Sequence, residues 1–366
     1  MTVKQLFERK VYIKRALLYK IYRIPGIWQI LGVKFIPKMK SSNGEMVSFE
    51  AAVLEALNTY CEDAYQEKEM YQRDMIRAWY KNTVTPEEYF IFGFRDKSQQ
   101  QRDEFVSRKE KDQKMVLHVG LGEDYLLLKD KYKFYLFFKE FFHREVCRLS
   151  DSEMDKERFM IFCKSHFSYI AKNNKGRMGI GTIVRTHDGS QGAIKEEMEY
   201  LLANGREWVI EELINQDDRM ALLNPDSVNT IRVCSKWNSK GFSVFEAFLR
   251  MGRAGSIVDN VSSGGLAAAI DIKTGIVNSD GFGKGVALYS QHPDSNVDLI
   301  GFKIPEWDSL MKEVQAIHSL ISYYPYVGWD FALSKEGWEV IEGNWGNFLT
   351  QYMKIGMRKE FEDCFR

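Results

Sequence analysis

The stretch GWDFALSKEGWEVIEGN, residues 328–344, contains two apolar runs separated by Ser334-Lys335-Glu336-Gly337. A polar turn whose glycine supplies a positive φ, flanked by strand-like runs, predicts a β-hairpin. Asp330 is predicted to open the first strand, and Glu342 and Asn344 lie in the second. Because Glu342 and Asn344 are two residues apart, their side chains leave the same face of an extended chain. The hairpin is therefore expected to bring three oxygen-bearing side chains to one place.

These three side chains are of the kind that binds a hard cation. Carboxylates and a carboxamide suit Mg²⁺, which keeps several waters and takes further ligands from substrate phosphates. Asp330, Glu342 and Asn344 are therefore predicted metal ligands in a nucleotide site. The alternative is a surface hairpin with solvated acids, and the pattern alone does not decide between the two.

Composition limits the class of protein. The chain has 366 residues, 45% hydrophobic and 28% charged, which is typical of a soluble globular protein with two or three lobes. Its 51 basic residues balance 51 acidic ones, which argues against nucleic-acid binding. The five cysteines show no CxxC spacing, so we predict neither a zinc site nor disulfides. With no long apolar run and no signal peptide at the start, a cytoplasmic location is expected.

The first 45 residues form a predicted basic amphipathic segment. Residues 1–40 hold ten Lys or Arg and a single acid, Glu8, mixed with bulky apolar side chains. Such a segment can pack its apolar side on the protein, or it can contact an anionic membrane surface or glycan-assembly enzymes. Both interpretations stay open, so peripheral contact with the inner face of the cell membrane is one prediction.

A helical N-terminal region is predicted over residues 46–125. Apolar residues recur with helical period over 49–57, and Thr85-Pro86-Glu87-Glu88 has the features of a helix start, with threonine as cap and proline in the first turn. The charged run 99–114 is interpreted as a solvated helix face.

A lobe with a glycine-rich loop is predicted over residues 126–210. It starts near a helix carrying Lys131, and FMIFCKSHFSYIAK at 159–172 is interpreted as short strand-like runs ending in Lys172. The loop 173–182 follows, and its glycines would let backbone N–H groups approach phosphate oxygens while lysine supplies positive charge. The loop fits neither a P-loop nor a Rossmann fingerprint, and by itself it is also compatible with a hairpin turn. Its predicted phosphate-binding glycines are Gly176, Gly179 and Gly181.

A second lobe carrying the metal site is predicted over residues 211–366. A strand at 208–214 contains Glu211 and Glu212, and a later strand directs Arg232 away from its apolar neighbours. Arg250 lies in the strand that ends FLRMGR. The small polar loop that follows contains Asn260.

The order of these features resembles the ATP-grasp enzymes. More narrowly, LNPDSVNTIRV, GRAGSIVDNVSSGGL and the hairpin sequence look like the sugar-transfer-associated ATP-grasp proteins found among bacterial polysaccharide genes. The resemblance covers roughly residues 85–355. It implies an α+β ATP-grasp fold, in which two α/β lobes with antiparallel sheets sandwich ATP, preceded here by the helical N-terminal region.

The resemblance also implies which residues contact the nucleotide base. The strand between the lobes would carry the adenine, with Glu211 or Glu212 and the backbone of Leu213 at its edge. Asp217 or Asp218 would contact the ribose.

The phosphate contacts follow from the same resemblance. Lys131 and Lys172 would neutralise phosphate oxygens, and the loop 173–182 would close over them as a lid. Arg232 would hold the transferring phosphoryl group, because a guanidinium matches charge spread over several oxygens. The loop that contains Asn260 is compatible with a simple turn, but beside the strand that carries Arg250 it would also suit an acyl phosphate approached by an amine.

The implied activity is that of a Mg-ATP-dependent carboxylate–amine ligase that forms an acyl-phosphate intermediate. The family name suggests a uronic acid or amino acid joined through an amide to a bacterial surface polysaccharide or its precursor. Two alternatives stay open: an ATP-grasp phosphotransferase acting on a sugar hydroxyl, and a non-catalytic nucleotide-binding scaffold for glycan assembly. Acceptor pockets have no readable sequence code.

Overall fold

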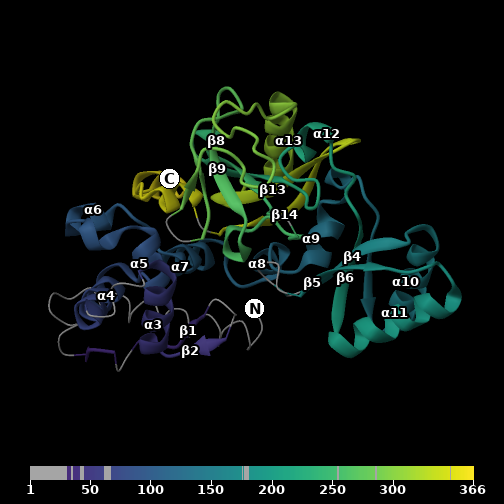
Figure 1. Ribbon diagram of the computed structural model, residues 1–366, viewed down its shortest axis with the longest axis horizontal. Helices are drawn as coiled ribbons and strands as arrows, with labels where there is room; N and C mark the ends of the chain where they lie inside the picture. The colour runs from purple at the N-terminus through teal and green to yellow at the C-terminus, as the bar shows by residue number, and fades with distance from the viewer. Residues whose placement is uncertain are drawn as a thin grey trace.

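The computed structural model describes residues 31–33, 36–41, 45–61, 67–174, 176, 181–253, 255–284, 287–346 and 348–366. They form a helical N-terminal region, a small four-stranded sheet with two helices, and a large central sheet that lies between the other two regions (Figure 1). Most of the basic segment 1–45 falls outside the described residues, so its contacts stay predictions.

The N-terminal region is helical, as expected. It contains β1 (Met39–Lys40), β2 (Met46–Val47), α3 (Phe49–Tyr60), α4 (Lys68–Asn82), α5 (Pro86–Ile91), η2 (Phe94–Asp96), α6 (Gln99–Asp103) and α7 (Arg108–Val119). The predicted start of α5 is confirmed: Thr85 and Glu88 form a reciprocal capping box with proline in the first turn. Buried aromatic side chains, among them Tyr71, Trp79 and Tyr89, fill the core of this region.

The charged run 99–114 is not the solvated helix face that its composition suggests. The chain leaves α6 at Asp103 and begins α7 at Arg108, and Arg102 and Lys111 are buried. The Arg102 guanidinium donates to both carboxylate oxygens of Asp74, at 2.8 and 2.6 Å, which compensates its burial. The partner lies 28 residues earlier, so the local sequence gives no sign of the pairing.

The small sheet has the strand order β3-β6-β4-β5 and is entirely antiparallel. Its elements are β3 (Val146–Ser150), α10 (Glu153–Ser165), β4 (Ser168–Asn173), β5 (Thr182–Thr186), α11 (Gln191–Asn204) and β6 (Glu207–Glu212). The first apolar run of FMIFCKSHFSYIAK is therefore helical rather than strand-like. Phe159, Phe162 and Cys163 have helical spacing and are buried on one face of α10.

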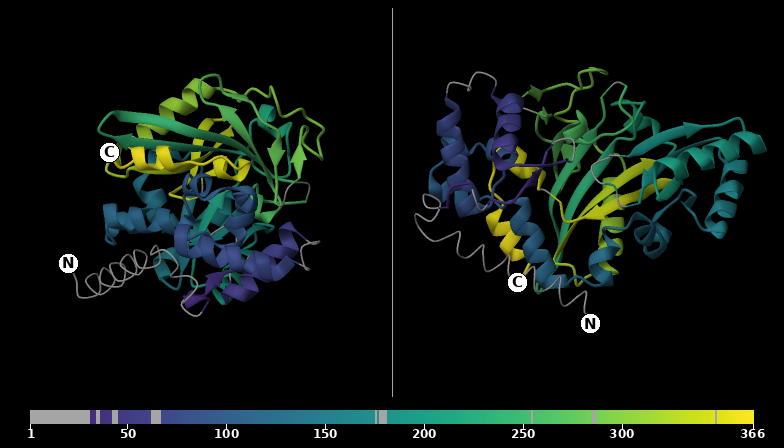
Figure 2. Two further views of the ribbon diagram at one scale, coloured as in Figure 1. Left: turned by 90° about the vertical axis from the view of Figure 1, so that its left-hand side faces the viewer. Right: turned by 90° about the horizontal axis from the view of Figure 1, so that it is seen from below.

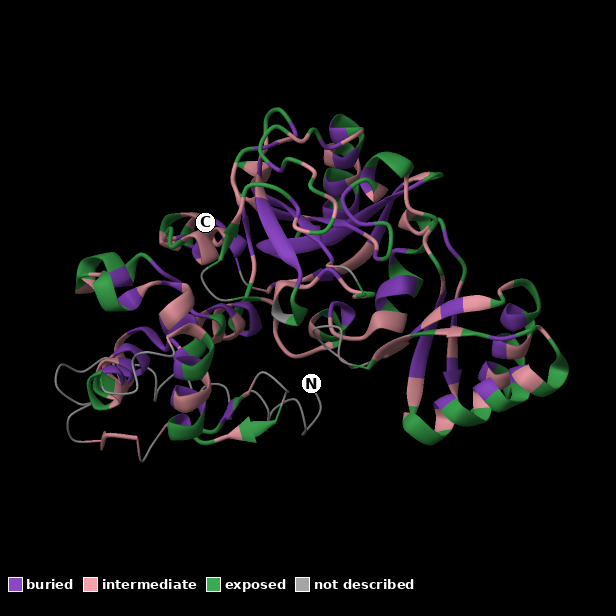
Figure 3. Cartoon of the chain, in the orientation of Figure 1, coloured by how far each residue is buried: buried purple, intermediate pink, exposed green. Residues whose placement is uncertain are grey.

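The central sheet has the order β12-β11-β9-β8-β7-β13-β14, with β10 also paired to β9. These strands are β7 (Thr230–Asn238), β8 (Gly241–Met251), β9 (Leu266–Asp271), β10 (Ile276–Val277), β11 (Gly281–Phe282), β12 (Leu288–Tyr289), β13 (Tyr326–Ser334) and β14 (Gly337–Asn344). Both sheets are antiparallel, which confirms the predicted α+β class. Figure 3 shows that the strands of this sheet are largely buried.

The predicted hairpin is confirmed in β13 and β14, and Gly337 has the expected positive φ of 121°. The expectation that Asp330 opens the first strand is wrong. Strand β13 begins four residues earlier, at Tyr326, because Tyr326 and Val327 already pair with β7. Asp330 therefore lies at the middle of a fully buried strand, with a paired strand on each side.

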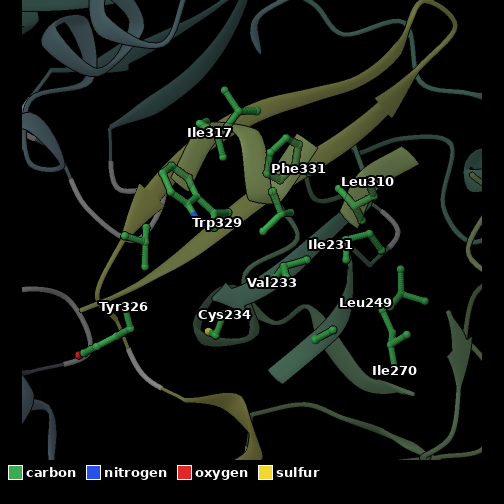
Figure 4. Packing of buried hydrophobic residues seen from close by; sticks show 14 of the residues in the cluster. Ile231, Val233, Cys234, Leu249, Ile270, Leu310, Ile317, Tyr326, Trp329 and Phe331 are labelled. Carbon is green, nitrogen blue, oxygen red and sulfur yellow. The ribbon is translucent and has the colours of Figure 1, made fainter. Parts of the chain in front are cut away.

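One face of the central sheet packs into the main hydrophobic core (Figure 4). Trp329 and Phe331 of β13 point to this face, as do Ile231 and Val233 of β7. Helix α13 (Trp307–Ser319) covers them with Leu310, Val314 and Ile317. Residues alternate along a strand, so Asp330 and Arg232 lie on the opposite face.

The remaining helical elements of the described residues are short. They are α8 (Glu123–Leu127), α9 (Lys131–Phe137), η3 (Lys139–Phe141), α12 (Asp218–Ala221), η4 (Val261–Ser263), η5 (Leu349–Met353) and α14 (Arg358–Asp363). The C-terminal elements return to the helical region (Figure 2). There Arg358 pairs with Glu110 of α7 at 2.5 and 3.0 Å. Strand β6 crosses the domain boundary predicted after residue 210. No helix within the described ranges is long and apolar enough to cross a bilayer.

Candidate active site

A cavity of about 2020 Å³ is lined by all three regions of the protein. The small sheet contributes Lys172 and Glu211, and the central sheet contributes Arg232 and Glu342. The helical region closes a further side with residues of α3, α5 and α7. The cavity is larger than a typical ligand pocket, so it has room for more than one substrate.

Strand register explains how the central sheet assembles its charged residues. Asp330 pairs directly with Arg232 of β7 on one side and with Glu342 of β14 on the other. Arg250 of β8 pairs with Thr230, two residues before Arg232. Directly paired residues share a face, and so do residues two apart on one strand. One face of four adjacent strands therefore carries the whole set.

Asp330 is held between two arginines. Arg232 donates through Nε and through Nη2, the latter at 2.8 Å, and Arg250 donates to the same carboxylate at 2.7 Å. Burial acts to raise the pKa of Asp330, but the charges of Arg232 and Arg250 outweigh it and lower the pKa to about 2. Asp330 is therefore a carboxylate at neutral pH, and its charge is fully compensated by neighbours.

Arg250 also connects the sheet to the loop that precedes β9. Its Nη2 donates to Asp259 at 2.7 Å and to Asn260, and Thr230 donates to the other oxygen of Asp259. Arg250, Asp259 and Asn260 all line the cavity. The structure thus brings the predicted catalytic residues Arg232, Arg250 and Asn260 together.

Glu342 lies next to Asp330 but in a different electrostatic position. The Asn344 side chain donates to Glu342 at 3.3 Å, and both side chains are half-buried at the cavity. Burial raises the pKa of Glu342, and the Asp330 charge adds to this, against the opposing charges of Arg232, Arg250 and Lys131. The ionised form of Glu342 is therefore incompletely compensated by the protein.

This arrangement fits a divalent cation. Two carboxylates and a carboxamide face the same cavity, and a cation beside Glu342 would relieve the cost of its buried charge. Within the described parts of the chain no group of three His, Cys, Asp or Glu side chains gathers as a metal site. The predicted donors are a mixed set, Asp330, Glu342 and Asn344, and the structure brings all three to the cavity.

The small sheet supplies a second set of charges on the facing wall. Lys172 donates to Glu211 at 2.8 Å, and Arg144 donates to the same carboxylate at 2.9 Å. Burial acts to raise the pKa of Glu211, but Lys172 and Arg144 lower it to about 2. Arg144 also reaches β14 through Glu339 and the Val340 carbonyl, so it ties the small sheet to the central one.

Lys131 is the first residue of α9 and lines the same cavity. Its ammonium donates to the carbonyls of Asn173 and Gly176, at 3.2 and 2.5 Å, at the start of the glycine-rich loop. Gly176 lines the cavity, whereas Gly181 begins the approach to β5 with a φ of 76° and is not part of the lining. Gly179 lies outside the described residues.

The predicted adenine-binding strand ends at the cavity, but the predicted ribose contact does not. Glu211, Glu212 and Leu213 line the cavity. Asp218 is not among the lining residues; its exposed carboxylate lies 3.4 Å from the Lys335 ammonium at the hairpin turn. The structure therefore does not bring Asp218 to the other predicted residues.

The model of the family described as "Sugar-transfer associated ATP-grasp" matches residues 113–357, more than half of the chain. The chain belongs to this ATP-grasp family. No curated protein sequence matches it.

Solved structures similar to this ATP-grasp protein include three ligases. D-alanyl-alanine synthetase A from Vibrio cholerae is 12% identical with a TM-score of 0.41, and the match covers 65% of this chain and 63% of that one. The D-alanine-D-alanine ligase from Helicobacter pylori is 13% identical with a TM-score of 0.41, and the match covers 66% of this chain and 61% of that one. The L-amino acid ligase from Bacillus licheniformis is 11% identical with a TM-score of 0.38, and the match covers 64% of this chain and 48% of that one. The chain thus spans about three-fifths or less of the length of these ligases.

Four residues of the ATP-grasp site are absent from the sequence prediction: Arg144, Thr230, Asp259 and Glu339. Asp259 directly precedes Asn260 in the loop that the prediction noted, so an acid beside an arginine-bearing strand was a usable signal. Arg144 has no such signal, because its partners lie 67 and 195 residues away.

Proposed function

We propose that this protein is a Mg-ATP-dependent carboxylate–amine ligase that works through an acyl-phosphate intermediate. The observation that carries the proposal is the charged face of the central sheet. Arg232, Arg250, Asp330, Glu342 and Asn344 meet on it, at a cavity whose facing wall offers the lysines of the small sheet and α9. Membership of the ATP-grasp family supports ATP as the nucleotide.

Two lysines would bind the phosphates. Lys131 and Lys172 both line the cavity, and a lysine ammonium on a flexible stem can turn from a protein acceptor to a phosphate oxygen. Glu211 keeps Arg144 as its partner when Lys172 turns away, so the movement leaves no buried unpaired carboxylate. The glycine-rich loop next to Lys131 would cover the phosphates, and the backbone of Leu213 would meet the adenine.

Asp330, Glu342 and Asn344 would hold Mg²⁺. When bound, the ion neutralises phosphate oxygens and orients the β- and γ-phosphates for in-line attack. Glu342 has the fewest competing protein partners of the two acids, so it is the principal ligand in this proposal.

The chain's arginines would then act on the transferring group. A substrate carboxylate oxygen attacks the γ-phosphorus, the bond to the β-phosphate oxygen breaks, and ADP leaves. Arg232 and Arg250 share Asp330, and their guanidiniums would stabilise the negative charge on the equatorial oxygens. The amine next attacks the acyl carbon, phosphate leaves, and the amine loses a proton, which completes the amide. Asn260 sits beside Arg250 where the amine would approach.

The substrates in this proposal are a uronic acid or an amino acid, joined to a bacterial surface polysaccharide or its precursor. The protein would work in the cytoplasm, with residues 1–40 in contact with an anionic membrane or with glycan-assembly enzymes. Removal of residues 1–40 should release the protein from phosphatidylglycerol vesicles while ATP binding persists. Unchanged vesicle binding would contradict this part of the proposal.

Isotope transfer tests the reaction directly. The protein is incubated with Mg-ATP, an amine and a panel of uronic and amino acids labelled with ¹⁸O in the carboxylate. Attack by the carboxylate on the γ-phosphorus transfers one labelled oxygen to the released phosphate, which mass spectrometry detects. Unlabelled phosphate would contradict an acyl phosphate, and a phosphorylated sugar without free phosphate would indicate a phosphotransferase.

A further inference from the structure

The cavity has a wall that the ligase chemistry described above does not use. Residues of α3, α5 and α7 form most of it, and all of these except Gln113 precede the part of the chain that matches the ATP-grasp family, residues 113–357. Tyr60 and Phe90 lie on this wall with their rings stacked, 5.6 Å between centroids and 12° between planes. Both rings are only half-buried, so they present apolar surface to the cavity.

A second aromatic pair lies beside the first. Tyr352 of η5 and Phe282 of β11 stack at 5.7 Å and 23°, and both line the cavity. Helix α5 packs against η5, which brings the two pairs together. Burial raises the pKa of Tyr60, and the charges of Glu87 and Tyr352 act in the same direction.

Two charged side chains stand among the rings. Glu87 and Arg108 are exposed and line the cavity. One side chain connects the N-termini of α5 and α7. Glu88 completes the capping box of α5 and also accepts from the Arg108 backbone N–H of α7 at 2.7 Å. Burial raises the pKa of Glu87 against the opposing charge of Arg108. Glu87 thus keeps a surface open to the cavity, as expected of a side chain on a ligand wall.

This wall is continuous with the site of phosphoryl transfer. Trp345, which follows Asn344, donates to Asp112 of α7 at 2.9 Å. Arg108 precedes Asp112 by four residues on α7, which is one helical turn, or about 6 Å along the axis. On the other side, Val261, the neighbour of Asn260, packs into the same cluster as Phe282 and Tyr352.

We infer that this wall, made by Tyr60, Glu87, Phe90, Arg108 and Tyr352, is a subsite for the pyranose ring of a saccharide substrate. One face of a pyranose presents C–H groups that pack on aromatic rings, and its hydroxyls need charged or amide partners at the edge of the ring. Glu87 can accept from two neighbouring hydroxyls, and Arg108 can donate to ring substituents or to a carboxylate. The inference rests on the proposed function, because the saccharide is taken to be a ligase substrate.

Saturation-transfer NMR on the full chain tests the subsite, with methyl β-D-glucuronide as the probe. Glutarate is the matched compound, since it has a carboxylate but no ring. Saturation should reach the C–H protons of the sugar, and glutarate should displace it poorly. We expect Tyr60→Leu and Tyr352→Leu each to weaken sugar binding about tenfold or more, because they remove the stacking surface. Tyr60→Phe keeps the ring and should stay within about twofold of the wild type.

Two controls separate this inference from its foundation. Tyr200→Leu removes an exposed tyrosine of α11 that is not part of the cavity lining, and it should leave sugar binding unchanged. The Mg-ATP-induced rise in melting temperature should be equal in wild type and Tyr60→Leu, which shows that the variant is folded. A wild type that binds the sugar without any Mg-ATP response would contradict the proposed function and leave the subsite standing.

Three results would overturn the subsite. These are no saturation transfer to the sugar in the wild type, equal competition by glutarate, and wild-type affinity in both leucine variants. If one leucine variant does not fold, Glu87→Gln supplies the remaining test. This substitution should weaken binding of the sugar and leave binding of glutarate unchanged.

Discussion

The two strands of the final hairpin carry acids that face each other but differ in how the protein treats their charge. Asp330 on β13 is enclosed by Arg232 and Arg250, and its pKa is lowered to about 2. Glu342 on β14 is directly paired with it in the sheet, yet burial raises its pKa. The first acid holds three strands together, whereas the second is left with charge that the protein does not fully compensate. A bound cation would supply the missing compensation at Glu342, so the two positions should respond in opposite ways to neutralisation.

The largest effect is expected from Asp330→Asn. The substitution leaves the buried guanidiniums of Arg232 and Arg250 short of a negative partner, and breaking a buried pair by removing one partner costs about 3–5 kcal/mol. Urea unfolding of the free protein should therefore show a markedly lower midpoint. A loss below about 1 kcal/mol would mean that Asp259 alone can balance the arginines, and the contrast with Glu342 would fail.

Glu342→Gln should affect ligand binding rather than the stability of the free protein, the reverse of what we expect for Asp330→Asn. Without ligand its free energy of unfolding should equal or exceed that of the wild type, because a neutral amide replaces a carboxylate whose ionised form is costly here. With Mg-ATP at about a hundred times its dissociation constant, the wild type gains about 2.7 kcal/mol, and the variant should lose most of this gain. Glu336→Gln is the matched control, since it makes the same change at an exposed position in the turn of this hairpin.

The pH dependence of stability should separate the two acids by sign. The folded pKa of Asp330 is about 2, below its ordinary 3.8, so its contribution of about 2 kcal/mol is present above pH 3.8 and is lost as the pH falls towards 2. The folded pKa of Glu342 is raised above 4.5, so this group lowers stability as the pH rises through that value. Urea titrations at a series of pH values should therefore show the advantage of Glu342→Gln growing with pH. A constant difference between the two proteins would contradict the raised pKa.

Lys172→Met tests the phosphate-binding role proposed for the small sheet. Glu211 keeps Arg144 at 2.9 Å, so the free protein should lose little stability. A lost hydrogen bond between a lysine and a phosphate weakens binding by about 1.5–3 kcal/mol, or about tenfold or more in the dissociation constant of ATP. Calorimetric titration with ATP measures this. Equal affinities would place the phosphates away from Lys172.

The sequence predicts this hairpin better than it predicts the surroundings of the site. Alternation and the turn glycine are local signals, so the strands and the shared face of Glu342 and Asn344 could be predicted. The start of β13 could not, because a strand with a paired neighbour on both sides is buried throughout and shows no polar boundary at Tyr326. The helix α10 was missed because its aromatic run is rich in residues that also favour strands.

Long-range charge pairing was beyond the sequence. Arg144 joins Glu211 and Glu339 across 67 and 195 residues, and only the packing of the two sheets brings them together. The same applies to the wall of Tyr60, Glu87 and Arg108, whose residues come from three helices. Local sequence patterns therefore predict contacts between the paired strands of the hairpin, but not contacts between separate sheets or helices, which depend on tertiary packing.

The smallest effect is expected at Asp218. This acid is neither paired with arginines, as Asp330 is, nor part of the cavity lining, as Glu342 is. Its carboxylate is exposed, lies 3.4 Å from Lys335 and does not line the cavity. An exposed ion pair contributes little, so Asp218→Asn should change the free energy of unfolding by less than about 0.5 kcal/mol and leave the dissociation constant of Mg-ATP unchanged. Calorimetric titration of Asp218→Asn with Mg-ATP, with Glu342→Gln measured in parallel, tests this expectation. A clear loss of ATP affinity in Asp218→Asn would return this residue to the ribose contact that the family resemblance implies, and would require α12 to move towards the cavity when the nucleotide binds.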